Sequence, residues 1–487
     1  MTMNKGELMD IEIGFHKLSK WQWAGLILVA CIISAGLAAG SNTFFVNVTL
    51  EQRLQALEDQ VNIPVNSTIS AMIKESSYIV SQHNVSGTMY TCLINGTDDR
   101  AGRLEYYDTD AATVIQAAIN AGICTYVKEG EYTISDTITI SSANHKLVGS
   151  GFGTIFKAAN NLNKDIFRIG TGNMFIQLQD FQIDGNSANN TSGRGISLGE
   201  SGSSTWVWFT RLRIRDCKQN ALYSKSTSPS SGCYFVEGCR FSDAGGAGQH
   251  LVNLNGVADV QLINNHFGGS GSGYDIIILN NCARVVIAGN YIDYGGQHGV
   301  DLYNCKYCRV LSNQIEYNQK HGVRIAPVSA EYRYNIIEGN NIALNNRANA
   351  ATTDGINVDS TYNTIVGNCI TDTTPYHRYG IREGASADYN VIKANVIDGV
   401  VTGGILKVGA NTIVRNNIGH KTENSGSSTG TGAQQTIAHG LAATPTRVYI
   451  TPTATGATEA CLSAASDATN IYPTVTNLKT YMWYAEV

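Results

Sequence analysis

Short runs in which aliphatic and polar residues alternate recur along most of the chain. The stretch "HGVDLYNC", from His298, returns as "HGVRIAPV" from His321, "DGINVDST" from Asp354 and "YGIREGAS" from Tyr379. Alternation with a period of two is typical of a half-buried β-strand and not of a helix. The aliphatic positions persist while the polar residue between them changes. The pattern therefore predicts strands that share one core and expose a variable outer face.

A second phrase, of the form "IAGNYI", recurs with an asparagine in its fourth position. Successive asparagines are 25, 23, 27, 28, 27 and 21 residues apart, and each interval contains three short strand-like runs. A period in this range predicts a solenoid, in which each strand pairs in parallel with the next coil about 4.8 Å away. We expect the asparagines to occupy a sharp left-handed turn and to stack in a line that continues three apolar positions: Asn265, Asn290, Asn313, Asn340, Asn368, Asn395 and Asn416, after Phe181, Leu212 and Cys239.

The segment before the repeats reads "DTDAATVIQAAINAG", which predicts an amphipathic helix that begins at an aspartate, and alternating strands with glycine turns follow it. With the repeats, this order resembles the right-handed parallel β-helix family with the pectate-lyase-like fold. The resemblance covers roughly residues 105–420 and implies an all-β, right-handed parallel β-helix of about ten coils. It leaves the activity open, because this fold hosts lyases, hydrolases, epimerases, phage tailspikes and inert adhesins.

The N-terminal part of the chain carries a membrane signal. Residues 23–40, "WAGLILVACIISAGLAAG", contain no charge and have about the length that spans a bilayer. Lysines precede this run and only Arg53 follows within 20 residues, which predicts a cytoplasmic segment 1–22, a transmembrane helix 23–40 and an extracellular bulk. A cleaved signal peptide is the alternative. Export would suit the Asn-x-Ser/Thr sequons at Asn47, Asn66, Asn84, Asn95, Asn189 and Asn190.

Residues 41–104 are predicted to be a partly helical stalk and linker. Leu50, Leu54, Leu57 and Val61 form an apolar seam at heptad spacing. This seam indicates either a coiled coil that joins protomers, which we expect to form a homotrimer, or a single amphipathic helix on its own domain. After the solenoid, residues 421–433 read as a flexible Gly/Ser/Thr linker, and residues 434–487 resemble a small β module of phage-fibre-like surface proteins.

Composition and cysteine spacing limit the kinds of ligand and partner that the protein is expected to bind. The formal net charge is −5, charged residues are 15% of the chain and no basic block is present, so nucleic acid is not an expected partner. Cys282 and Cys305 hold the same slot in adjacent coils, so they are either a disulfide or two stacked free thiols. The pair Cys305 and Cys308 has metal-type spacing but no second pair, and no zinc site is predicted.

The candidate ligand contacts lie on the strands that begin near "HGVDLYN", where the resemblance implies a ligand-facing sheet. The outward row is Asp301, Arg324, Asn357 and Arg382, and a second column at the strand starts is Asp275, His298, His321 and Asp354. A glycine column, Gly299, Gly322, Gly355 and Gly380, is expected to leave a smooth floor for a chain-like ligand. No cofactor is predicted, although a carboxylate in such a row is also a ligand type that Ca²⁺ takes.

Two functions follow from these residues. The first is a membrane-anchored extracellular β-helix that binds polysaccharide or mediates surface attachment, because an arginine next to an aspartate suits a uronate sugar. The alternative is an enzyme on an extracellular glycan, a lyase, glycoside hydrolase or epimerase. The chain lacks the "WIDH" and "RxPxxR" signatures of pectate lyases and the "NTD…DD…GHG…RIK" series of polygalacturonases. No catalytic residue is therefore assigned, and plain surface ion pairs remain an interpretation of the same row.

Overall fold

The computed structural model describes residues 77–487, apart from 97–100, 171, 173, 200–204, 227–231, 244–248, 328, 330, 348–351 and 375. The predicted cytoplasmic segment, transmembrane helix and heptad seam lie outside these residues. Within the described part, no helix is long and apolar enough to cross a membrane.

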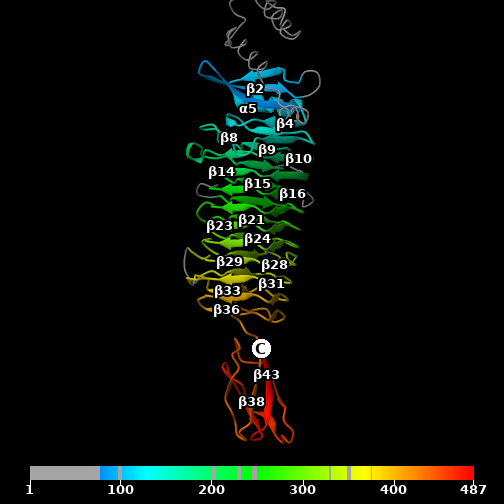
Figure 1. Cartoon of the computed structure of the whole chain (residues 1–487), viewed down its shortest axis with the longest axis vertical. Helices are drawn as coiled ribbons and strands as arrows, with labels where there is room; N and C mark the ends of the chain where they lie inside the picture. Colours follow the sequence, from blue (N-terminus) through cyan, green and yellow to red (C-terminus); the bar gives the residue numbers. More distant parts are fainter. Residues whose placement is uncertain are drawn as a thin grey trace, which may run out of the picture. The chain divides into compact units, whose positions relative to one another are not determined.

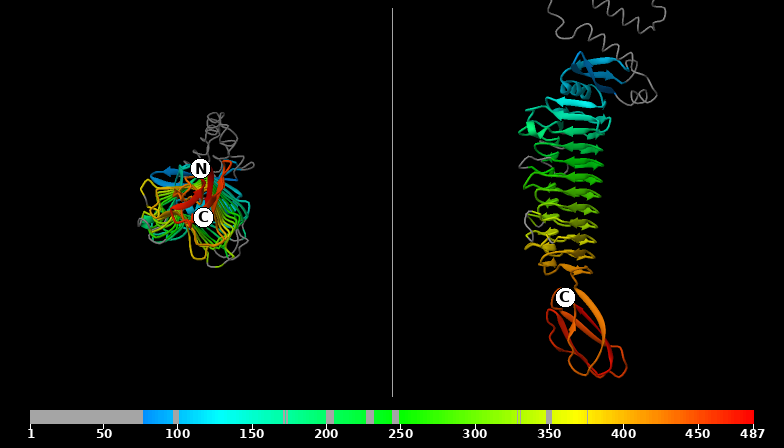
Figure 2. Two further views of the ribbon diagram at one scale, coloured as in Figure 1. Left: turned by 90° about the horizontal axis from the view of Figure 1, so that it is seen from below. Right: turned by 60° about the vertical axis from the view of Figure 1, so that its left-hand side comes forward.

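Three parallel sheets wind into a solenoid, as the repeats predict (Figure 1, Figure 2). Each coil supplies one strand to each sheet in the order A, B, C. Sheet A holds β4 (Cys124–Val127), β7 (Lys146–Gly149), β10 (Met174–Gln179), β13 (Thr205–Thr210), β16 (Gly232–Glu237), β19 (Gln261–Ile263), β22 (Val286–Ala288), β25 (Arg309–Leu311), β28 (Ile336–Glu338), β31 (Thr364–Val366), β34 (Val391–Lys393) and β37 (Ile413–Arg415).

Sheets B and C complete the coils. Sheet B holds β5 (Gly130–Ile134), β8 (Thr154–Ala158), β11 (Gln182–Asp184), β14 (Arg213–Arg215), β17 (Arg240–Ser242), β20 (His266–Gly268), β23 (Tyr291–Asp293), β26 (Gln314–Glu316), β29 (Asn341–Ala343), β32 (Cys369–Thr371) and β35 (Val396–Asp398). Sheet C holds β6 (Ile138–Ile140), β9 (Phe167–Ile169), β12 (Ile196–Leu198), β15 (Leu222–Lys225), β18 (Val252–Asn255), β21 (Ile277–Asn280), β24 (Val300–Tyr303), β27 (Val323–Ala326), β30 (Ile356–Val358), β33 (Tyr379–Glu383) and β36 (Gly403–Leu406).

The core consists of inward side chains that stack in register from coil to coil. In sheet B, Ile292 pairs with Ile315 and Ile315 with Ile342, and all three are fully buried. Burial of one such side chain contributes roughly 1.5–3 kcal/mol, so the stability of the solenoid accumulates along these stacks.

The asparagine line is present, and it lies between sheets A and B. In Asn290, the side-chain Nδ2 and the backbone N both donate to Oδ1 of Asn313, at 2.9 Å each, and Asn313 donates in the same way to Asn340. Because every amide is buried and bonded, the line fixes the coil-to-coil spacing. Two details of the prediction are wrong.

First, the left-handed residue is the one before each ladder asparagine, for example Gly289 (φ 66°) before Asn290 and Ala394 (φ 56°) before Asn395. Second, the last ladder position is Asn417, whose Oδ1 accepts from Asn395 N at 3.0 Å, while Asn416 occupies the left-handed turn with φ 56°. Two adjacent asparagines made the slip of one residue invisible in the sequence pattern.

A helix closes the first coils. Helix α5 (Ala111–Ala121) begins at Asp110, whose carboxylate accepts from Ala112 N, and its apolar face is buried in the same core. Beside it, β1 (Tyr78–Val85), β2 (Thr88–Asn95) and β3 (Leu104–Asp108) extend sheet A with antiparallel pairs. The predicted stalk and linker over residues 41–104 is therefore wrong for this part, because alternating apolar residues and a Ser86–Gly87 turn with positive φ angles form a hairpin.

The C-terminal β module is larger than predicted. It comprises β38 (Glu423–Thr429), β39 (Ile437–Ala438), β40 (Arg447–Pro452), β41 (Ala460–Ala464), β42 (Asn470–Val475) and β43 (Thr480–Glu486) in two antiparallel sheets with their own apolar core. The predicted linker over 421–433 is instead strand β38 for most of its length, since main-chain pairing with β43 needs no apolar side chain. Gly426 leaves room for the Trp483 indole, which would lie 2.8 Å from a Cβ there.

The structure shows the state of one cysteine pair and how exposed four of the sequons are. Cys282 and Cys305 are buried free thiols, which is the second of the two alternatives above. Asn95 and Asn190 are buried in the fold, whereas Asn84 and Asn189 are exposed. Among the four sequons that the structure describes, the exposed pair alone offers its amide to a glycosylating enzyme after folding.

Candidate functional site

The predicted outward row exists on sheet C. Asp301 on β24 pairs with Arg324 on β27, Arg324 with Asn357 on β30, and Asn357 with Arg382 on β33. The four side chains therefore lie on successive coils, about 4.8 Å apart. The Arg324 guanidinium donates from Nη1 to Asp301 Oδ2 at 3.4 Å. Its side chain remains 33% exposed, whereas that of Asp301 is 5% exposed.

Asp301 is a buried carboxyl with spare hydrogen-bonding capacity. Its Oδ1 is buried and has no hydrogen-bond partner among the described residues. Burial, and after it the carboxylate of Asp275, raises the pKa of Asp301, Arg324 lowers it, and the result is a pKa of about 7. This carboxyl therefore exchanges its proton near neutral pH.

Asn357 connects the two halves of the row. With its amide oriented so that both atoms are satisfied, its oxygen accepts from Arg382 Nη1 at 3.0 Å and its nitrogen donates to Asp359 Oδ2 at 3.1 Å. Burial raises the pKa of Asp359, which Arg382 and Arg324 partly counteract. Acidic and basic groups thus alternate across these coils and hold one another in place.

The second predicted column also exists, but its side chains bond mainly to the backbone of the next coil. Nδ1 of His298 accepts from His321 N at 3.2 Å, and Nδ1 of His321 accepts from Asp354 N at 2.8 Å. Asp275 takes part in the same way, because its Oδ1 accepts from His298 N at 3.0 Å. An imidazole nitrogen that accepts carries no proton, so Nδ1 of His298 is unprotonated. Nδ1 of His321 lies within hydrogen-bonding distance of both Asp354 N and Asp354 O, the latter at 3.2 Å.

Burial explains why these rings stay neutral. Burial first, and then cationic neighbours that include Arg324, disfavour the protonated form of each ring, so the pKa of His298 is lowered to about 2 and that of His321 to about 3. The two rings stack at 5.0 Å. His298, Asp275 and Asp354 are buried, so only His321 reaches the surface in part. The column supports the row and supplies little surface of its own.

Sequence reasoning missed three members of this cluster. His250 begins the column, because its Nδ1 accepts from Asp275 N at 3.1 Å. Arg378 pairs with both carboxylate oxygens of the fully buried Asp354, at 3.0 and 2.9 Å. Asp359, described above, is the third. The phrase "HLVNLN" at His250 has the frame of "HGVDLYN" and could have revealed His250, whereas Arg378 and Asp359 flank strands, where alternation carries no signal.

The glycine column does not form a floor for ligand. A Cβ on Gly322 would lie 2.5 Å from Cγ2 of Ile342 and 2.9 Å from the carbonyl oxygen of Gly355. Gly299 and Gly355 are crowded in the same way by Ile315 and Ile370 of sheet B. These glycines face inward at the coil corner, where only a hydrogen fits beside the core isoleucines.

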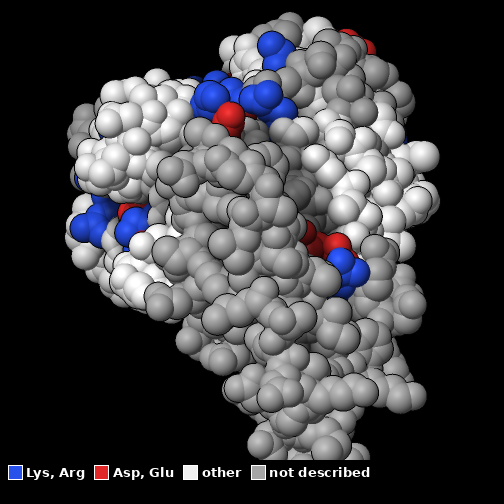
Figure 3. Space-filling view, turned by 90° about the horizontal axis from the view of Figure 1, so that it is seen from above, with Lys and Arg blue, Asp and Glu red and all other residues white. Residues whose placement is uncertain are grey.

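Two long segments precede sheet C strands, residues 186–194 before β12 and residues 345–347 and 352–353 before β30. In the loop 186–194, Asn186 donates to Ala158 O of the preceding coil at 2.9 Å, and Arg194 lies 3.7 Å from the Tyr223 ring centroid. In the second segment, Asn346 donates to Tyr376 O at 2.6 Å. Where described residues are visible in Figure 3, Lys and Arg side chains lie next to Asp and Glu side chains.

Metal ligands do not gather in the described part of the chain. Among those residues, no group of three or more His, Cys, Asp or Glu side chains is arranged to hold a metal ion. The row on sheet C makes hydrogen bonds and an ion pair of its own, among them Arg324 to Asp301 and Asn357 to Arg382.

Comparison with known proteins supports the fold. The family model described as "Right handed beta helix region" matches residues 200–352, and the curated proteins contain no significant match. With its three parallel sheets, the protein is thus a right-handed parallel β-helix, as the sequence predicts. The AlgE6 A-module of mannuronan C-5 epimerase from Azotobacter vinelandii is similar in structure, with 20% identity, a TM-score of 0.51 and coverage of 63% of this chain and 94% of the module.

Two further structures are similar. The AlgE4 A-module of mannuronan C-5 epimerase from Azotobacter vinelandii has 19% identity, a TM-score of 0.50 and coverage of 63% of this chain and 95% of the module. The Dettilon tailspike protein has 13% identity and a TM-score of 0.46, and the match covers 81% of this chain and 92% of that protein. At these identities the likeness shows the fold alone.

Proposed function

We propose that this protein binds an acidic extracellular polysaccharide on the outer face of sheet C. The observation that carries this proposal is the row Asp301, Arg324, Asn357 and Arg382 on four successive coils. A guanidinium pairs well with a sugar carboxylate, and the carboxyl and amide groups beside it suit sugar hydroxyls. Fold similarity to proteins named as mannuronan epimerases is consistent with this class of ligand.

The spacing of the row suits a linear sugar chain. Asp301 and Arg324 are one coil apart, so about 5 Å separates them. A sugar unit at this step meets the partly exposed Arg324 guanidinium, which the buried Asp301 holds in place. Asp301 and Asn357 are two coils apart, about 10 Å, which is nearly the span of a disaccharide. A chain parallel to the stacking direction of the coils would meet Arg324 and Arg382 at alternate sugars.

Replacing Arg324 by alanine should weaken binding of a uronate oligosaccharide by roughly 10- to 100-fold, because a hydrogen bond to a charged group contributes about 1.5–3 kcal/mol. Stability should change by about 1 kcal/mol or less, since the guanidinium is partly exposed and its ion pair is long. Calorimetric titration of the full-length protein measures the affinity. Arg309→Ala, an exposed arginine on sheet A, is the matched control for loss of one positive charge.

The result that contradicts the proposal is equal affinity in the wild type, Arg324→Ala and Arg309→Ala. Asp301→Asn adds a second comparison, because it keeps the shape of the buried side chain and removes its charge. If Asp301 orients Arg324, this variant should also bind the oligosaccharide more weakly.

One observation favours an enzymatic alternative. A carboxyl with a pKa of about 7 beside an arginine is what proton abstraction next to a sugar carboxylate requires. In this reaction the C5–H bond breaks and the proton passes to Asp301 while Arg324 pairs with the sugar carboxylate. Return of a proton to the opposite face of C5 gives epimerisation, and expulsion of the oxygen at C4 gives a lyase product.

Incubation with uronate oligosaccharides in D₂O tests this alternative. Deuterium at C5, seen by NMR, or unsaturated chain ends, seen by ultraviolet absorbance, should form with the wild type and fall by at least 100-fold with Asp301→Asn. If neither product forms at sugar concentrations that saturate binding, the enzymatic alternative fails and the binding proposal is unaffected.

We further propose that residues 23–40 hold the protein in a membrane with the solenoid outside the cell, and that the seam from Leu50 to Val61 joins three chains. The uncharged length of the first segment and the heptad spacing of the second support these assignments. A surface tether would present several glycan sites together, which increases avidity without new contacts.

A further inference from the structure

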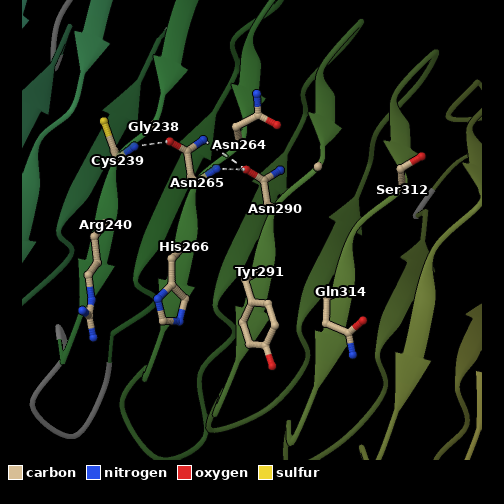
Figure 4. Close-up of a pocket in the computed structure, with 11 residues that line it drawn as sticks. Gly238, Cys239, Arg240, Asn264, Asn265, His266, Asn290, Tyr291, Ser312 and Gln314 are labelled. Atoms are coloured by element: carbon tan, nitrogen blue, oxygen red, sulfur yellow. Dashed lines mark hydrogen bonds between the residues drawn. The ribbon is translucent and has the colours of Figure 1, made fainter.

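A second row of hydrogen-bond donors lies on the outer face of sheet B, which shares no residue with the row on sheet C. Arg213 on β14 pairs with Arg240 on β17, and His266 on β20, Tyr291 on β23 and Gln314 on β26 follow in register. Figure 4 shows the last four side by side on successive strands. Arg240, His266, Tyr291 and Gln314 also line a hollow of about 430 Å³ along the asparagine turn. Five coils in a row thus present a polar donor at the same outward position.

The two arginines of this row lack ion pairs in the described part of the chain. Nε of Arg213 is buried there without a hydrogen-bond partner. The neighbouring arginines differ in having ion pairs, because Arg211 donates to both oxygens of Asp180 at 2.6 and 2.7 Å and Arg215 pairs with Asp184 at 2.7 Å, although Nε of Arg215 is also buried without a partner. Like charges directly opposite on adjacent strands destabilise a sheet. An anion placed between Arg213 and Arg240 would remove this repulsion.

Carboxylates in the neighbouring outward row hold the other donors. Asp293 Oδ1 lies 3.3 Å from Nε2 of His266, and Glu316 accepts from the Tyr291 hydroxyl and from Gln314 Nε2, the latter at 2.8 Å. The rings of His266 and Tyr291 meet edge to face at 5.4 Å. The side chains are therefore fixed before any ligand arrives, which reduces the entropy lost on binding.

A glycine makes this arrangement possible. A Cβ on Gly268 would lie 2.6 Å from Asp293 Oδ1 and 3.2 Å from Nε2 of His266. The Asp293 carboxylate therefore occupies space that any other residue at position 268 would fill. This fit is local to the pair and has no role in the inner core, since it lies on the outer face of the sheet.

We propose that this row is a second binding site for an acidic polysaccharide, with a sugar carboxylate or sulfate between Arg213 and Arg240 and sugar hydroxyls on His266, Tyr291 and Gln314. The inference rests on the proposed function for the class of ligand, but its residues are all different. A chain along the row would meet one side chain about every 4.8 Å, close to the length of one extended sugar unit. Two cations among five donors suit a sparsely charged glycan better than a nucleic acid, which needs a phosphate contact at nearly every step.

Titration of the full-length protein with three probes tests this site: a uronate hexasaccharide, the same oligosaccharide with its carboxylates reduced, and a sulfated hexasaccharide. Arg213→Ala/Arg240→Ala should remove one of two classes of site or weaken it by more than 10-fold, without loss of thermal stability because a repulsion is removed. Arg211→Ala, whose side chain is already paired, is the matched control and should titrate like the wild type. The reduced probe should bind at least 10-fold more weakly than both acidic probes, and comparison of the acidic probes shows whether carboxylate or sulfate is preferred.

The variants separate failure of this site from failure of the site on sheet C. If Arg213→Ala/Arg240→Ala titrates like the wild type while Arg324→Ala is weakened, the inference about sheet B is wrong and the proposed function stands. If only the double variant loses binding, sheet B is the glycan site and the proposal for sheet C is wrong. Equal binding of the reduced probe, or tighter binding of a single-stranded oligonucleotide of equal charge, overturns the acidic-glycan assignment.

Discussion

Replacing Ile315 by aspartate is expected to prevent the solenoid from folding. Ile315 is fully buried on the inner face of β26, between Ile292 and Ile342 of the adjacent coils. The new carboxylate would have no partner there, and an unpaired buried charge costs several kcal/mol in addition to the lost apolar burial. Since the net stability of a folded protein is about 5–15 kcal/mol, this single change consumes most of it.

Soluble yield and the circular dichroism of β-structure measure the effect, with Ile315→Val as the control. The valine removes one methylene group and should cost about 1 kcal/mol, which leaves a folded protein with a slightly lower unfolding midpoint in urea. If the Ile315→Asp protein were soluble and unfolded at the same urea concentration as the control, residue 315 could not face the core.

The fold could be predicted because every coil of a solenoid repeats the same pattern of apolar and polar residues in the sequence. Ile292, Ile315 and Ile342 recur in one position of one phrase, and the neighbouring asparagines Asn290, Asn313 and Asn340 fix the register. Each coil repeats the same local pattern, so a wrong assignment in one coil does not change the assignment of the next. The last ladder position shows the limit of this reasoning. Asn416 is predicted and Asn417 occupies it, because two adjacent asparagines fit the sequence pattern equally well.

The outer rows could be predicted in position but not in chemistry. Strand alternation placed Asp301 and Arg324 on the outer face, but it could not show that Asp301 is buried beside Arg324 with a pKa near neutrality. That pKa depends first on burial and then on Asp275, which belongs to a different coil. Alternation also failed at strand ends, where Gly322 faces inward although strict parity would point it to solvent.

The histidine column illustrates the same limit. Within the sequence, His298 and His321 are polar residues near the start of an exposed strand, which indicates ligand contact. In the structure, each Nδ1 accepts a backbone N–H of the following coil. The rings therefore link successive coils at the start of the sheet C strands, as the asparagines link them between sheets A and B. Such a role depends on the coil above and has no signature within one repeat.

Three largely buried histidines should make the protein less stable as the pH drops below about 6.5. His298 and His321 have folded-state pKa values of about 2 and 3, and buried His145 has one of about 4, all below the ordinary value of 6.5. Between those values the unfolded chain binds more protons than the folded one, so the free energy of unfolding is largest above pH 6.5 and decreases as the pH falls. Asp301 acts in the opposite direction, because its raised pKa lets the folded state bind a proton as the pH falls through about 7.

Asp216, Asp293 and Asp359, whose pKa values burial also raises, act like Asp301, whereas half-buried His420, whose pKa is lowered, acts like the other histidines. Each of the three histidines contributes a loss of at most about 1.4 kcal/mol per pH unit. His298→Asn isolates one contribution, because the asparagine oxygen can accept from His321 N as the imidazole nitrogen does, but it does not titrate in this range. Urea unfolding at several pH values should give a slope shallower by about 1 kcal/mol per pH unit in this variant than in the wild type. Identical slopes would mean that His298 is already protonated, or solvated, in the folded protein, and the neutral column described here would then be incorrect.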